Sequence, residues 1–122
     1  MPVSDRSATI ESLKELAAQF TDERDWNQFH SAKELAIGLV TEAAELLQHF
    51  RFKTDGQIKK LIDGRNRAKV EDEIADVLFL LLRLSTNIQC DLAGSLGRKL
   101  AKDSRHYPVK WARGKNLKYN ER

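Results

Sequence analysis

Apolar side chains recur along this chain with the spacing of helices, not with the alternation of strands. Thr9 is predicted to cap a first helix, and residues 22–29 are predicted to form a polar and aromatic connection. A second helix is predicted from about Ser31 to His49 or Phe50, because one of its sides carries a continuous series of apolar residues. The first half of the chain is therefore expected to form two amphipathic helices.

The second half of the chain continues this pattern. A short helical turn is predicted within residues 57–65, and a third, longer helix from about Arg67 to Ile88. Asp91 is predicted to cap a fourth helix, which must end before Pro108 because proline lacks the amide hydrogen that a helix interior needs. The predicted fold class is all-α, with a subunit similar to a four-helix bundle.

The third helix is apolar on nearly every side from Val77 to Leu84, and Arg83 is the one interruption. A helix of that kind is buried on more than one side. Four short helices in one chain cannot easily cover it, so we expect a homo-oligomer. The alternative is a compact monomeric bundle with a thick central helix.

The length of 122 residues fits one domain, with a helical core at about residues 9–108. Residues 109–122 lack apolar periodicity and are expected to form an extended or disordered basic tail. The longest apolar run, Val77 to Leu82, is far shorter than the ~20 residues that span a bilayer. The single thiol, Cys90, excludes an internal disulfide framework. We therefore expect a cytoplasmic protein with no membrane partner.

The net charge of +3 is unevenly distributed along the chain. Residues 98–122 hold nine Lys or Arg against Asp103 and Glu121, a balance of +7, so residues 1–97 carry −4. A protein that binds nucleic acid usually spreads basic charge over its fold. An acidic body with a basic end instead suits a site that binds cations and then anions.

Two acidic pairs stand within the apolar helices. Glu42 and Glu45 lie on the second helix, and Glu73 and Asp76 lie on the third. Residues three apart are neighbours on a helix face, so the four carboxylates converge if the two helices pack antiparallel. Mg²⁺ takes oxygen ligands and typically bridges carboxylates to substrate phosphates, which predicts metal-assisted phosphoryl transfer or hydrolysis.

The acidic pairs have two other interpretations. An acidic pair on a helix commonly lies on a face that is exposed to solvent and binds no metal. Two such pairs within apolar helices make this interpretation weaker. Zinc would need nitrogen or sulfur ligands, and we find no Cys or His at helical ligand spacing beside the pairs. The sequence therefore favours a hard divalent cation such as Mg²⁺.

Several segments, in order, resemble those of the MazG-like all-α nucleoside triphosphate pyrophosphohydrolases. The pattern E-x-x-E, then 27 residues, then E-x-x-D is similar to their acidic signature. Residues 24–30, Arg-Asp-Trp-Asn-Gln-Phe-His, resemble the R-D-W-x-Q-F-H segment of the dCTP pyrophosphatase branch. The resemblance covers about residues 9–120. A further family segment, K-x-x-x-N-x-R-x-Y-P, is matched by Lys99, Arg105, Tyr107 and Pro108.

This resemblance implies helical subunits paired into a dimer or a dimer of dimers. It implies Mg²⁺-dependent cleavage of a nucleoside triphosphate between the α and β phosphates, which gives the monophosphate and pyrophosphate. dCTP or a related pyrimidine nucleotide is the expected substrate. The implied metal ligands and catalytic residues are Glu42, Glu45, Glu73 and Asp76.

The resemblance also implies residues that contact the substrate. The implied phosphate-binding residues are Lys99, Arg105 and, as a further possibility, Lys102. The implied base-binding residues are Trp26, His30 and Phe52, with the Phe52 ring opposite the indole of Trp26. Tyr107 matches the family segment, but the resemblance implies no specific role for it. Without the resemblance, the cations would be interpreted as complementing a helix C-terminus, and Trp26 as packing the end of the bundle.

Three positions depart from the family pattern. Asp103 replaces the expected Asn, so an amide that can donate becomes a carboxylate that can only accept. Ala17 stands where dCTP-preferring relatives carry a His, and Leu80 replaces a Tyr. Both of these changes remove polar groups that can read a base edge, so selection of cytosine is expected to be loose.

Two classes of function remain open at this point. The first is a nucleotide pyrophosphohydrolase, including a dUTP-directed or a phosphoribosyl-ATP hydrolase of the same superfamily. The second is a non-enzymatic helical oligomer that binds nucleic acid through its basic tail. We expect the first, with a nucleoside triphosphate as substrate, a homodimer or homotetramer as the assembly, and no nucleic-acid partner.

Overall fold

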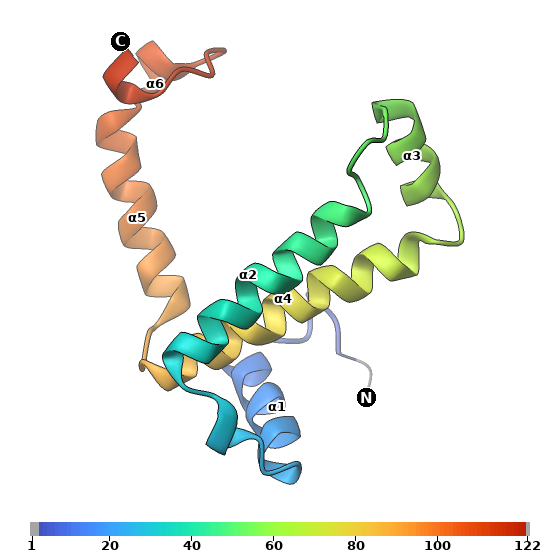
Figure 1. The fold of residues 1–122 in the computed structure, drawn as a ribbon. Coiled ribbons are helices and arrows are strands. Elements are labelled where there is room, and N and C mark those ends of the chain that lie inside the picture. The colour runs from blue at the N-terminus through green and yellow to red at the C-terminus, as the bar shows by residue number, and fades with distance from the viewer. Residues whose placement is uncertain (1–2, 122) are drawn as a thin grey trace. The chain divides into compact units, whose positions relative to one another are not determined.

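The chain is described by a computed structural model that covers residues 3–121 and is helical without strands over these residues (Figure 1), so the all-α fold class is confirmed. Two compact units divide the chain between Gln89 and Cys90. The elements of the first unit are α1 (Ile10–Glu23), η1 (Asn27–Phe29), α2 (Ala32–Gln48), α3 (Asp55–Asp63) and α4 (Arg67–Asn87). The elements of the second unit are α5 (Leu92–His106), α6 (Val109–Ala112) and η2 (Tyr119–Glu121).

Side-chain caps fix the starts of three helices, as predicted. The hydroxyl of Thr9 accepts from the amide of Ser12 at 3.0 Å, and the Ser12 hydroxyl accepts from the amide of Thr9 at 2.8 Å. Ser31 caps α2, and Asp91 caps α5. These bonds satisfy amide groups that a helix N-terminus leaves without partners. The predicted starts of the first, second and fourth helices are confirmed.

The short turn predicted within residues 57–65 is a complete helix, α3, and it begins earlier. Thr54 caps it, because its hydroxyl accepts from the amide of Gln57 at 3.2 Å and the Gln57 side chain accepts from the amide of Thr54 at 2.9 Å. Gly64 ends the helix. The reciprocal cap adds a first turn that the apolar spacing alone does not reveal.

α2 and α4 run antiparallel and side by side, joined through α3, and α1 packs against α4 (Figure 1). The buried apolar side chains include Leu35 on α2 and Leu82 on α4. Gly38 permits a close approach, because a Cβ atom added there would stand 3.2 Å from Cδ1 of Leu80. The antiparallel arrangement brings the middle of α2 beside the first half of α4.

Large apolar side chains of this pair of helices remain exposed. Val40 on α2 is 70% exposed, and Ile74 on α4 is more than half exposed. They belong to stripes that include Ile37 and Leu47 on α2 and Leu81 on α4. Burial of these stripes by a second subunit stays a prediction.

None of the described helices is by itself long and apolar enough to cross a membrane. Only α4 and α5 taken together meet that test, by length and composition alone.

The expectation of an extended or disordered tail after residue 108 is wrong for residues 109–112 and 119–121, which form short helical elements, whereas residues 113–118 form neither helix nor strand. Pro108 begins the short helix α6, and Tyr119 begins the turn η2. Contacts between rings hold this segment: Tyr107 stacks on Trp111 with centroids 6.3 Å apart, and His106 lies 4.2 Å from Tyr119. Such contacts join irregular backbone and need no apolar periodicity, so the hydrophobic pattern does not reveal them.

Candidate functional site

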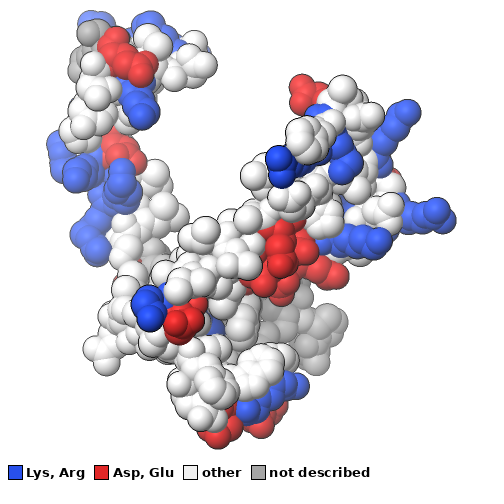
Figure 2. All heavy atoms as spheres, viewed as in Figure 1, with Lys and Arg blue, Asp and Glu red and all other residues white. Residues whose placement is uncertain are grey.

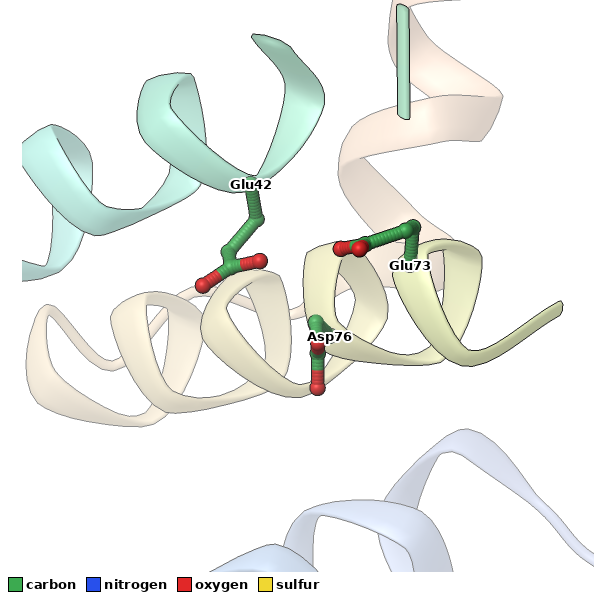
Figure 3. A group of neighbouring side chains, drawn as sticks. All are labelled: Glu42, Glu73 and Asp76. Carbon is green, nitrogen blue, oxygen red and sulfur yellow. The ribbon is translucent and has the colours of Figure 1, made fainter. Parts of the chain in front are cut away.

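Three carboxylates from two helices meet in the first unit. Glu42 reaches from α2 toward α4, which carries Glu73 and Asp76 (Figure 3). One carboxylate oxygen from each residue lies within 4.8 Å of the other two. Glu45, one turn after Glu42, lies outside this group of three but is close enough to raise the pKa of Glu42. Asp and Glu side chains accordingly form a patch over α2 and α4 in Figure 2.

The cluster contains oxygen atoms that the protein itself does not satisfy. Oε2 of Glu42 and Oε2 of Glu73 are buried and have no hydrogen-bond partner in the described part of the chain. A buried carboxylate without a partner is costly, because it has lost water and gained nothing in return. Several carboxylate oxygens directed to one place are the donor set that hard divalent cations prefer. The residues therefore fit a Mg²⁺-type ion.

The pKa of Glu42 is raised from its ordinary value of 4.5 to about 7, and burial is the largest cause. The nearby Glu45 carboxyl and the charges of Asp76 and Glu73 contribute to the same rise. All these causes disfavour the ionised form. Without a cation, Glu42 is therefore largely protonated below neutral pH.

This shift predicts how stability depends on pH without a divalent cation. The pKa of Glu42 is higher in the folded chain than its ordinary value of 4.5, so its contribution is fully present below pH 4.5 and is lost as the pH rises through about 7. We expect the free energy of unfolding, measured with urea in EDTA, to fall more for wild type than for Glu42→Gln between pH 5 and 8. Equal falls for both proteins would contradict the prediction.

The sequence reasoning missed one residue of this site. His49, at the end of α2, is partly buried, with Nε2 3.8 Å from Oε1 of Glu73. The statement that no His stands at helical spacing beside the acidic pairs is therefore wrong. His49 follows Glu45 by four residues and Glu42 by seven, which places all three on one face of α2. This spacing is visible in the sequence and could have identified His49 as a neighbour of the acidic pairs.

An apolar pocket of about 540 Å³ opens beside the cluster, between α1 and α4. Asp76 belongs to both, because it lines the pocket and contributes to the three carboxylates. Trp26 lines the pocket and meets Phe20 edge to face, with ring centroids 5.7 Å apart. The other lining residues are Leu13, Leu16, Ala17, Ala75, Leu78, Phe79 and Leu82.

Trp26 is the one residue of the predicted base-binding set that lines this pocket. His30 is not among the lining residues. Its ring lies 6.5 Å from that of Phe79, which lines the pocket. Phe52 is 90% exposed, and the guanidinium of Arg51 lies 4.5 Å from its ring centroid. Within one chain, the described structure does not bring the Phe52 ring opposite Trp26.

Ala17 and Leu80, the two positions predicted to affect base recognition, lie in different surroundings. Ala17 lines the pocket, so a longer polar side chain there would enter it. Leu80 is not among the lining residues and packs against Gly38 between α2 and α4. The apolar character of the pocket therefore involves Ala17, whereas Leu80 belongs to the packing of the helices.

The predicted phosphate-binding residues lie in the second unit. Lys99, Lys102 and Arg105 line one hollow on α5, of about 550 Å³. Asp103 forms an ion pair with Lys99, with Oδ1 2.5 Å from Nζ. Tyr107 follows α5 and contacts the aromatic rings of the C-terminal segment.

Comparisons with known proteins agree on one family. The model of the MazG-like family matches residues 37–121. The human dCTP pyrophosphatase 1 is 38% identical over 114 residues, which are 93% of this chain and 67% of that protein. The bovine dCTP pyrophosphatase 1 is 35% identical over the same share of this chain and 68% of its own length. The crystal structure of a pyrophosphatase from Archaeoglobus fulgidus is similar with a TM-score of 0.76 and 31% identity, over 88% of this chain and 99% of that one.

Proposed function

This chain belongs to the MazG-like family, and on that basis we propose that it hydrolyses a nucleoside triphosphate between the α and β phosphates with Mg²⁺ as cofactor. It is an enzyme, a nucleotide pyrophosphohydrolase of the dCTP pyrophosphatase type. In the proposed reaction one water is consumed, and the products are the nucleoside monophosphate and pyrophosphate. The resemblance that the sequence motifs indicated is confirmed.

The position of Asp76 carries this proposal. Its carboxylate belongs to the cluster with Glu42 and Glu73, and its side chain also lines the pocket of Trp26. A nucleotide whose base occupies that pocket would have its phosphates next to the carboxylates. Because one residue belongs to both the base site and the cation site, a bound nucleotide would have its phosphates held close to the cation, as hydrolysis requires.

The residues that would hold Mg²⁺ are Glu42, Glu73 and Asp76, with Glu45 beside them. Bound Mg²⁺ supplies positive charge that offsets the charge of the triphosphate as the α–β bond breaks. α2 and α4 fix the carboxyl groups on two packed helices, so that little reorganisation accompanies the reaction.

We assign the phosphates to Lys99, Lys102 and Arg105. Ammonium and guanidinium groups donate charge-assisted hydrogen bonds to phosphate oxygens. The three side chains share one hollow on α5, so they can act on a single triphosphate.

dCTP or a related pyrimidine nucleotide is the proposed substrate. It is supported by the similarity to the human and bovine dCTP pyrophosphatases. The lining of the pocket limits how specific the enzyme can be for one base. Apart from Asp76 and the indole N–H of Trp26, the lining side chains are hydrocarbon. Stacking and shape then select the base more than hydrogen bonds do, and we expect several bases to be accepted.

The proposed assembly is a cytoplasmic homodimer or homotetramer. The exposed apolar stripes of α2 and α4 support it, since contiguous apolar surface of this kind commonly marks an interface between proteins. The mass of the protein in solution, measured by light scattering, tests it.

A panel of substrates tests the activity. dNTPs, NTPs and phosphoribosyl-ATP are assayed with Mg²⁺ and with EDTA, and the products are identified as monophosphate or diphosphate. Formation of monophosphate and pyrophosphate from dCTP, dependent on Mg²⁺, is the expected result. Exclusive turnover of dUTP or of phosphoribosyl-ATP would move the protein to another branch of the superfamily. Absence of turnover with every compound would refute the proposal.

The ion pair on α5 yields a prediction about Asp103. An ionised Asp103 holds Lys99 by charge and also repels the triphosphate, so it acts against binding. Asp103→Asn should lower KM about two- to fivefold, the range expected for an exposed ion pair. Steady-state kinetics with dCTP checks this, and Ser104→Ala on the same helix is the control. An unchanged kcat/KM would show that Asp103 does not face the substrate, whereas a collapse would favour a role as metal ligand.

A further inference from the structure

Arg83 is a buried charge that belongs neither to the carboxylate cluster nor to the pocket lining. It stands in the otherwise apolar stretch of α4, and its side chain is only 7% exposed. A buried guanidinium usually has a carboxylate partner, because removing its charge from water is costly. No ion pair links Arg83 to an acidic residue among residues 3–121, and its Nε is buried without a partner. An apolar side chain would suit this position at least as well for stability.

Among residues 3–121, the Arg83 side chain forms one hydrogen bond, and it joins distant parts of the chain. Nη2 of Arg83 donates to Oδ1 of Asn27 at 2.8 Å, across 56 residues of sequence. The amide group of Asn27 in turn donates to the carboxylate of Asp22 near the end of α1. Asn27 therefore bridges α4 to the segment that carries Trp26.

A second bond from α4 reaches the same segment. Nδ2 of Asn87, one turn beyond Arg83, donates to the carbonyl oxygen of His30 at 3.0 Å. Burial, together with the charge of Arg83, lowers the pKa of His30 and keeps its ring neutral near pH 7. The turn from Trp26 to His30 is thus tied to α4 at both ends.

Trp26 is the residue of this turn that lines the pocket. Its backbone amide donates to the carbonyl oxygen of Thr21, and its side chain is partly exposed, so the ring is not fixed by burial alone. The next residue, Asn27, is the one that Arg83 holds. We propose that Arg83 is a positioning residue that, through Asn27, sets the indole of Trp26 for stacking on the base. This inference rests on the proposed function, because it concerns the nucleotide that the pocket receives.

The test compares Arg83→Met, which removes the hydrogen bond but keeps the length of the side chain, with wild type. We expect KM for dCTP to rise about tenfold, a size typical of a displaced substrate-positioning group, with kcat within about twofold. Inhibition by inorganic tripolyphosphate, which has no base, should not change. The melting temperature should stay the same or rise, because a buried charge is replaced by an apolar group.

Two variants and one control complete the series. Arg83→Lys keeps a donor and should give a KM between those of wild type and Arg83→Met. Asn87→Ala removes the second bond at a solvent-exposed position, so it tests the same turn even if Arg83→Met does not fold. Ser85→Ala is the matched control on α4, because the Ser85 hydroxyl is buried but bonds only to Leu82 of its own helix.

Trp26 emission separates this inference from the proposed function. In a Trp111→Phe background Trp26 is the remaining tryptophan, and its emission reports binding of dCTP without turnover. Weaker binding in Arg83→Met and Asn87→Ala, but not in Ser85→Ala, supports the inference. Unchanged binding and KM in both variants would overturn it, as would an equal loss of tripolyphosphate affinity. If wild type binds dCTP without hydrolysing it, the proposed function fails while the role of Arg83 is still decided by the binding data.

Discussion

Replacing Asp76 by asparagine is expected to lower kcat about 10³-fold, since several kcal/mol of charge stabilisation depend on a bound cation and each 1.36 kcal/mol is a factor of about ten. The amide keeps the size of the side chain but removes the negative charge from a cluster of three carboxylates. Glu45→Gln is expected to act in the same direction. Steady-state kinetics at saturating Mg²⁺ measures the effect, and circular dichroism checks that the helices stay folded.

Glu71→Gln is the matched control for this change. Glu71 is an acidic residue of the same helix, but it forms an ion pair with Arg67 at 2.5 Å and lies outside the cluster. It should keep nearly full activity. Near-normal turnover in Asp76→Asn at saturating Mg²⁺ would show that the assignment of the metal ligands is wrong.

Replacing Trp26 by alanine is expected to raise KM roughly 5- to 150-fold, because stacking of a base on an aromatic ring contributes about 1–3 kcal/mol. The rise should be similar for every good substrate, since all bases present a π face. Phe29→Ala is the matched control, because Phe29 lies in η1, which directly follows Trp26, but does not line the pocket. Kinetics with dCTP, dUTP and dTTP measures the effect.

The same assay tests the character of the pocket. Hydrocarbon side chains cannot reject a base by its pattern of donors and acceptors, so discrimination between pyrimidines should be modest. A preference for cytosine of ~10⁴-fold is the scale that well-placed hydrogen bonds provide. Selectivity of that size would contradict the view that stacking dominates recognition.

The starts of the helices were predictable because they depend on local chemistry. Thr9, Ser31 and Asp91 cap their helices through hydrogen bonds to residues three positions away, and such bonds are visible in the sequence. The acidic pairs were predictable for a similar reason, since helical periodicity fixes which carboxylates share a face.

Other features depend on contacts between distant residues, which periodicity does not encode. The bond between Arg83 and Asn27 is one, and the contacts of the Tyr119 ring with His106 and Tyr107 are another. The exposure of Phe52 follows from its backbone, because φ is 65° there and directs the chain into a turn. His49 differs from these, because its helical spacing to Glu45 was present in the sequence and was overlooked.

The contact between Gly38 and Leu80 couples the evolution of two positions. Only 3.2 Å separates Cδ1 of Leu80 from the place where a Cβ atom of residue 38 would stand. A larger side chain at position 38 would therefore require the Leu80 side chain or the helices to shift, and a shift of the helices would also separate Glu42 from Glu73 and Asp76. Substitutions at the two positions are thus expected to occur as compensating pairs among descendants of this sequence, with a bulky residue at 80 retained where 38 is glycine.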